Sequence, residues 1–184
     1  SGQPTLASYR GELIARYPEL VESFAKLERW FDRQAEAAAV PIPLDDGSAL
    51  VRELAQVFGR VKGTRRSDWI SEGFAEYYAI ELVRRAGGMS EDRYQAVREH
   101  LTKWSRKVDS LRTERSTGPI TARAVLLLQE LDKEIRQRSK GRHSLDDVSR
   151  GLMRMDTVST DAFIEMTETL LGGGSKVLDT RLLR

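Results

Sequence analysis

Four polar side chains could do chemistry in the middle of the chain: Arg52, Glu53, Gln56 and Glu72. Residues 52 and 56 are one helical turn apart, so in a helix their side chains project from the same face. Carboxylates act as general bases and as ligands for hard cations, whereas an arginine keeps its proton and cannot bind a metal. Gln56 adds one weak amide oxygen. The set is therefore oxygen-rich and poorly suited to zinc.

Charge balance suggests what replaces a metal here. Unpaired carboxylates at the junction of two helices would be costly, and a guanidinium presents a planar fork that suits one or two of them. We expect Arg52 to pair with Glu72 or Glu53. The alternative is an exposed Arg52 beside hydrated carboxylates.

The spacing of these residues matches a known motif. Histidines at positions 52 and 56 would complete the His-Glu-x-x-His zinc helix, with the glutamate as general base. The run Trp-Ile-Ser-Glu-Gly-Phe-Ala-Glu-Tyr-Tyr-Ala at residues 69–79 resembles the segment that supplies the third zinc ligand in gluzincin metallopeptidases. The aminopeptidase-N-like and glycyl-aminopeptidase-like families are the most similar. The resemblance implies that Glu72 stands at the metal-ligand position and Glu53 at the general-base position.

A later segment extends the resemblance, which covers roughly residues 48–171. Thr121-Ala122-Arg123-Ala124 stands where the family has a Tyr-x-Lys-Gly run, so the resemblance implies that Thr121 occupies the position of the catalytic tyrosine. Both histidines and this tyrosine are missing, and Gln56 and Glu72 are closer in sequence than is usual. The resemblance thus implies the C-terminal helical lobe of a thermolysin-like catalytic domain that has lost its zinc.

Further candidate binding residues follow Glu72. Glu76 lies one turn later on a similar face; we expect a surface role or a salt bridge with Arg123 or Lys62, and a role in the site is the alternative. Tyr77 and Arg123 complete the candidate binding set. We expect Tyr77 and Tyr78 to pack, with at least one hydroxyl bonded to a carboxylate or carbonyl.

Composition limits the class of protein. The 184 residues are 40% hydrophobic and 32% charged, which predicts one soluble, helix-rich domain. No run reaches the ~18 apolar residues of a membrane helix, and no signal peptide is visible. The chain has no cysteine and two histidines, a poor supply of zinc ligands. The net charge of +2 does not favour nucleic acid.

The periodicity predicts an all-α helical bundle. Apolar residues at three- and four-residue steps, with caps and proline positions, predict helices and no strand. We expect N-terminal helices and a proline-rich turn at 1–47, the gluzincin-like region at 48–171, and a glycine-rich end with an apolar tail at 172–184. The expected helices are 4–17, 18–38, 48–58, 71–86, 90–111, one from Pro119 to the loop at 139–143, 145–154 and 160–171.

Three functions remain open. The first is an inactive metallopeptidase-like module that binds an unknown peptide or protein without a cofactor, in a cleft near Glu53, Glu72 and Thr121. The second is an active hydrolase that uses zinc or another metal. The third is a binder of anionic partners through the basic loop at 60–66. The chain starts with Ser1-Gly2, so we expect a fragment of a longer chain, exported if an upstream signal was removed.

Overall fold

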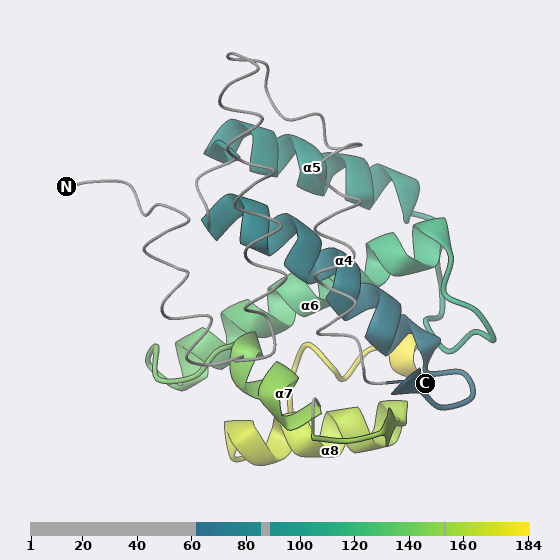
Figure 1. Ribbon diagram of the computed structural model, residues 1–184, viewed down its shortest axis with the longest axis vertical. Coiled ribbons are helices and arrows are strands. Elements are labelled where there is room, and N and C mark those ends of the chain that lie inside the picture. Colours follow the sequence, from purple (N-terminus) through teal and green to yellow (C-terminus); the bar gives the residue numbers. More distant parts are fainter. Residues whose placement is uncertain (1–61, 86–88, 153) are drawn as a thin grey trace.

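The computed structural model describes residues 62–85, 89–152 and 154–184 of the chain (Figure 1). Its helices are α4 (Asp68–Arg85), α5 (Glu91–Trp104), α6 (Gly118–Arg138), α7 (Leu145–Leu152), α8 (Thr160–Leu171) and the short 3-10 helix η2 (Arg181–Leu183). The all-α prediction is confirmed for this part of the chain. Arg52, Glu53, Gln56, and the helices expected at 4–17, 18–38 and 48–58 lie outside the described residues.

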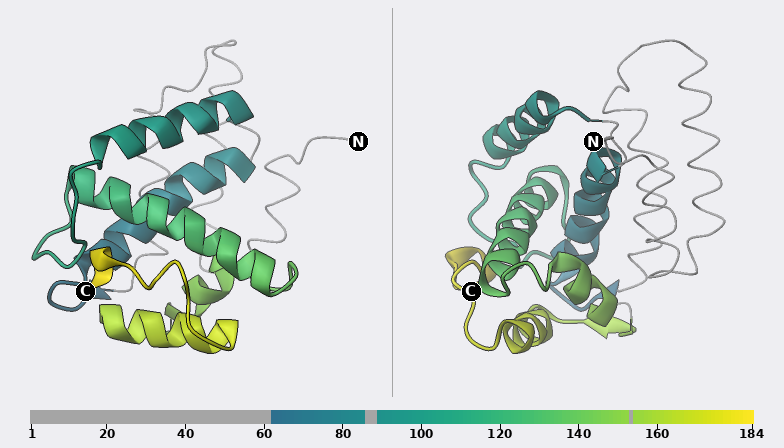
Figure 2. Two further views of the ribbon diagram at one scale, coloured as in Figure 1. Left: turned by 180° about the vertical axis from the view of Figure 1, so that it is seen from behind. Right: turned by 90° about the vertical axis from the view of Figure 1, so that its left-hand side faces the viewer.

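The long helix α6 is the centre of the bundle. Helix α4 crosses it, α5 packs against it on one side, and α7 contacts its C-terminal half (Figures 1 and 2). Ten residues of α6 are buried, among them Val125, Leu128 and Leu131, which are inaccessible to solvent. Burial of a Leu or Val side chain contributes about 1.5–3 kcal/mol, so α6 supplies much of the packing energy.

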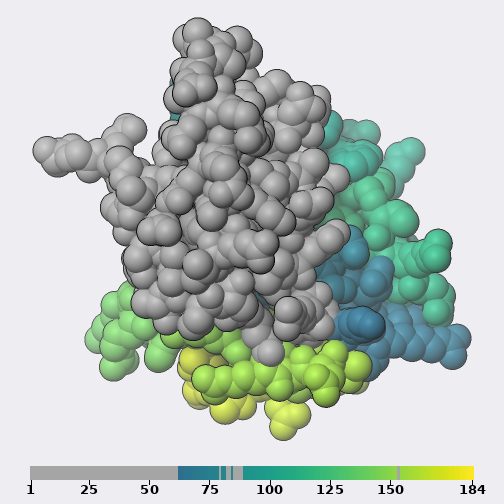
Figure 3. Space-filling view, viewed as in Figure 1, coloured from purple at the N-terminus to yellow at the C-terminus, as the bar shows by residue number. Residues whose placement is uncertain are grey.

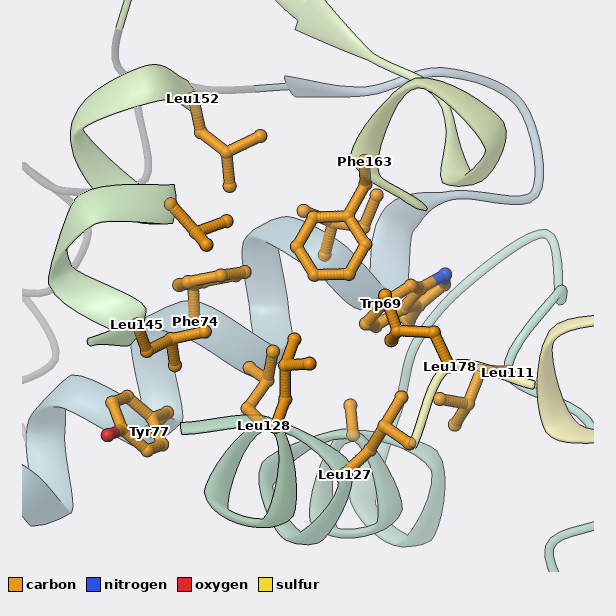
Figure 4. Packing of buried hydrophobic residues seen from close by; sticks show 14 of the residues in the cluster. Trp69, Phe74, Tyr77, Leu111, Leu127, Leu128, Leu145, Leu152, Phe163 and Leu178 are labelled. Atoms are coloured by element: carbon orange, nitrogen blue, oxygen red, sulfur yellow. The ribbon is translucent and has the colours of Figure 1, made fainter. Parts of the chain in front are cut away.

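An aromatic group joins α4 to α8 at the core. Trp69 is fully buried, and its ring packs edge-on against the Phe163 ring, with 5.4 Å between the ring centroids (Figure 4). Phe74 also packs edge-on against the Phe163 ring, with 5.9 Å between the centroids. The polar edge of the Trp69 indole is satisfied, because Nε1 donates to Thr160 Oγ1 at 3.0 Å. Trp69 and Phe74, the first and last residues of the Trp-Ile-Ser-Glu-Gly-Phe segment, are therefore explained by packing in the core.

A second apolar cluster lies between α5, the C-terminal half of α4 and the N-terminal half of α6. It contains Tyr94, Val97 and Leu101 of α5 and buried residues of the other two helices. Arg84 covers the Tyr94 ring, with its Cζ 4.0 Å from the ring centroid, which is cation–π geometry. This cluster fixes α5, and with it Trp104 at the end of α5, relative to the start of α6.

The predicted helix at 90–111 is wrong at its C-terminal end, because α5 stops at Trp104. The backbone N–H of Ser105 bonds to Leu101 O and closes the last turn. Val108 and Leu111 continue the helical spacing, yet they belong to a different cluster. Leu111 is fully buried beside the C-terminal tail, where its N–H donates to Leu182 O at 2.8 Å.

Two short features complete the fold. The strands β1 (Lys62–Gly63) and β2 (Thr157–Val158) form a parallel pair, which the sequence analysis did not predict. Figure 3 shows the blue start of the described chain beside the light-green residues that follow α7. The apolar tail docks, with Leu178 and Leu183 buried.

Candidate functional site

A cavity of about 290 Å³ lies where α4, the end of α5 and the start of α6 meet. It combines carboxylates, hydroxyls, an indole and small apolar side chains. The residues that line it are Glu72, Ala75, Glu76, Leu101, Trp104, Ser116, Gly118, Thr121 and Ala122. Three of them, Glu72, Glu76 and Thr121, are candidates from the sequence analysis, and the cavity brings them together.

Helix α4 provides the acidic wall. Glu72 is exposed and Glu76 is half-buried, one turn further along. Gly73 lies between them in the sequence and faces α6, where it sets how closely the two helices approach each other. A Cβ at residue 73 would lie 2.9 Å from the Ala124 Cβ, closer than two methyl groups can approach. The missing side chain therefore lets α4 and α6 come close together and sets the acidic wall beside the start of α6.

The hydroxyl wall comes from the start of α6 and the residues before it. Thr121 Oγ1 and Ser116 Oγ share a hydrogen bond of 2.9 Å, and Ser116 N–H donates to Asp68 Oδ2 at 2.8 Å. Asp68 is the first residue of α4. These bonds tie the two helices at one end of the cavity and fix the position of Thr121.

Trp104 forms the rim of the cavity. It is 51% exposed and is the only exposed large hydrophobic side chain among the described residues. Its ring lies against Gly118, where an added Cβ would be 2.9 Å from the indole Cζ2. Gly118 has a φ of +23°, a conformation that favours glycine. Sequence analysis missed Trp104 because its spacing continues the apolar stripe of α5, as does that of Val108 and Leu111, so the sequence did not mark Trp104 as the end of the helix.

The other candidates lie away from the cavity lining. Tyr77 is 2% exposed and packs edge-on against Tyr78 at 5.0 Å, and Arg123 is half-buried on α6. Tyr78 confirms the prediction of a satisfied hydroxyl, because its Oη donates to Asp146 Oδ1 at 2.8 Å. The same oxygen lies 2.6 Å from Ser149 Oγ, so this buried network joins α4 to α7.

The donor set for a metal is poor in this part of the chain. In residues 62–85, 89–152 and 154–184, no group of three His, Asp or Glu side chains is placed to hold a metal ion. Of the three ligand positions that the resemblance implies, the structure describes one, Glu72. The predicted pairing of Arg52 with Glu72 or Glu53 stays a prediction.

Two arginines of the basic loop have protein partners, whereas Arg60 lies outside the described residues. Arg65 forms an ion pair with Glu114 at 3.3 Å, and Arg66 Nε donates to Arg112 O at 2.9 Å. Both contacts join the residues before α4 to the segment before α6. They give the two arginines a structural role, and binding of an anionic partner at 60–66 stays a prediction.

Comparison of the chain with protein-family models, curated proteins and solved structures finds no significant match. Over the described residues, the search for a helix long and apolar enough to cross a membrane also finds none. The gluzincin resemblance therefore depends on the residues quoted above.

Proposed function

We propose that this chain is a gluzincin-like helical module that binds a peptide segment and does not hydrolyse it. The observation that carries the proposal is the shared cavity of Glu72, Glu76 and Thr121. Glu72 and Glu76 come from α4 and Thr121 comes from α6, and the resemblance assigns Glu72 and Thr121 to a peptidase site. Clefts between helices are common places for ligand binding.

The chemistry of Thr121 supports the loss of catalysis. A tyrosine at this position would present a phenol hydroxyl at the end of a long, rigid side chain. The Thr121 hydroxyl is close to the backbone and already shares a hydrogen bond with Ser116. A donor that stabilises an oxyanion must lie about 2.7–3.1 Å from the developing charge. The short Thr121 side chain is hydrogen-bonded to Ser116 and does not extend across the cavity as a tyrosine would.

The ligand inventory supports the loss of zinc. A hydrolytic zinc site needs three protein ligands and one open position for water. In this sequence the two histidine positions of the motif are Arg52 and Gln56, which leaves Glu72 as the one conventional ligand. Glu53 alone cannot activate a water molecule as a metal-bound nucleophile.

Metal analysis and an activity screen test the proposal on the full chain. We expect less than stoichiometric zinc after purification in zinc-supplemented buffer, and no hydrolysis of aminoacyl amides or short peptides. We also expect binding from a library of unmodified peptides, weakened by Glu72→Gln and unchanged by Glu165→Gln on the exposed face of α8. Stoichiometric zinc together with hydrolysis that Glu53→Gln abolishes would overturn the proposal.

A further inference from the structure

The exposed indole of Trp104 calls for an explanation beyond packing. Single apolar side chains at the surface are common and need none. Trp104 differs because half of it is exposed at the rim of a cavity, and because neighbouring groups hold it in place. Gly118 lies under the ring, and the His100 ring centroid is 5.8 Å away. The fold thus presents an ordered aromatic surface to whatever enters the cavity.

The chemistry opposite the indole specifies the charge of the ligand. Glu72 and Glu76 contribute carboxylates to the same cavity, while Leu101, Ala75 and Ala122 give it apolar surface. A cation placed on an indole is attracted by the electron-rich face of the ring, and a carboxylate adds a charge-assisted hydrogen bond. An apolar stem below a cationic end group would match the apolar lining.

The size of the cavity limits the ligand further. Its volume of about 290 Å³ is at the lower end of the range for small-molecule sites. One long side chain or one chain terminus fits this space, whereas a helix does not. The charged residues among the described cavity lining are Glu72 and Glu76, so an anionic group would meet two carboxylates there.

We propose that this cavity binds an alkylammonium or guanidinium group, stacked on Trp104 and neutralised at the wall formed by Glu72 and Glu76. The group belongs to a lysine or arginine side chain, or to the amino terminus of a peptide. The proposal rests on the proposed function only for the peptidic nature of the ligand. The indole, which the quoted peptidase motifs do not include, carries it.

Small probes separate these sources of positive charge. N-acetyl-lysine amide and N-acetyl-arginine amide present the side-chain cation, and glycinamide presents only the amino group. N-acetyl-norleucine amide keeps an apolar chain without the charge, and N-acetyl-glutamate amide reverses the charge. Binding to the full chain is followed at pH 7 and low salt by isothermal titration calorimetry and by NMR.

We expect at least one cationic probe to bind with a Kd on the order of 1 mM, and at least tenfold more tightly than the norleucine and glutamate probes. Binding by the N-acetylated probes alone identifies a side chain, and binding by glycinamide alone identifies an amino terminus. Trp104→Ala and the pair Glu72→Gln with Glu76→Gln should each weaken binding at least tenfold. Trp104→Phe should weaken it less, and Glu165→Gln should leave it unchanged.

Several results would overturn the inference. The inference is wrong if the norleucine or glutamate probe binds as tightly as the cationic probes. It is also wrong if the folded Trp104→Ala variant binds the cationic probes as tightly as the natural chain does. Folding of each variant is checked by circular dichroism and thermal unfolding. If unmodified peptides bind while no cationic probe does, the cation site is wrong and the proposed peptide-binding function stands. If zinc-dependent hydrolysis is found while cationic probes bind, the proposed non-hydrolytic function is wrong and the cation site stands.

Discussion

Two acidic positions on neighbouring helices, Glu134 on α6 and Glu72 on α4, have opposite surroundings. Glu134 is 9% exposed, and its carboxylate accepts hydrogen bonds from Ser175 Oγ at 2.5 Å and from the Lys176 N–H at 2.8 Å. The Val177 N–H and Arg138 Nη1 approach at 3.4 Å. Glu72 is exposed and lines a cavity.

The difference separates two uses of a carboxylate. The donors around Glu134 come mostly from the segment after the glycines 172–174, so this side chain fastens the tail that carries Leu178 and Leu183 into the core. Burial without such donors would cost several kcal/mol. The Glu72 carboxylate faces a cavity that a ligand can enter, so its removal should change binding more than stability.

The largest expected effect is on stability and tests this contrast directly. Glu134→Ala should lower the free energy of unfolding by about 3 kcal/mol, because it leaves several buried donors without an acceptor. Glu72→Ala should lower it by less than about 1 kcal/mol, since exposed glutamates contribute little. Both residues are helical glutamates, so helix propensity cancels between them. Urea denaturation of both variants measures the difference, and equal losses would contradict the contrast.

A second prediction concerns the packing below the acidic wall. Gly73→Val should destabilise the protein by about 2 kcal/mol, because a side chain at residue 73 meets the Ala124 Cβ. Helix propensity alone would favour the variant, because valine is a better helix former than glycine, so a measured loss reports the steric conflict. Chemical denaturation measures it.

A double-mutant cycle sharpens this prediction. Ala124→Gly removes the atom that a residue-73 side chain would meet, so it should recover part of the Gly73→Val loss. We expect a coupling energy of at least about 0.5 kcal/mol in the rescuing direction. Strict additivity of the two changes would show that α4 and α6 do not meet at these residues.

A third prediction tests a buried network outside the cavity. Tyr78→Phe should lower the free energy of unfolding by about 1.5 kcal/mol, because it removes the hydroxyl that donates to buried Asp146. Tyr94→Phe is the matched control: Tyr94 is also buried, and its ring contact with Arg84 persists in phenylalanine. Thermal and urea unfolding should show less than about 0.5 kcal/mol for the control. A comparable loss in both variants would mean that the Asp146 bond adds nothing.

Local signals predicted much of the described fold. Ser90 caps α5 through its side chain, Pro119 stands in the first turn of α6, and Gly172 ends α8 with a φ of 73°. Each signal acts within about one helical turn, so sequence spacing is enough to read it. The predicted bounds 160–171 for the last helix agree with α8.

Features that depend on distant partners were not predictable in this way. Leu111 fits the α5 stripe, but its burial against the C-terminal tail ends the helical pattern earlier. The β1–β2 pair is two residues long on each side, too short for an alternating pattern. At the site, motif spacing found Glu72 and Thr121, whereas Trp104 and Gly118 depend on how α5 meets α6.

The smallest predicted effect is the pH dependence at Glu134. Burial raises the pKa of this carboxyl group, but bonds from Ser175, Lys176, Val177 and Arg138 together outweigh it and lower the pKa below the ordinary glutamate value. A lowered pKa means that the unfolded chain binds the proton more readily, so stability from Glu134 is present above the unfolded pKa of about 4.3 and is lost as pH falls through the folded pKa. The gap in unfolding free energy between the natural chain and Glu134→Gln should therefore be constant from pH 7 to about pH 5.5 and shrink below about pH 4.5. Urea denaturation across this range measures it, with Glu165→Gln as the exposed control. A gap that widens on acidification would mean that the tail is fastened by the neutral acid, which would remove the contrast with Glu72.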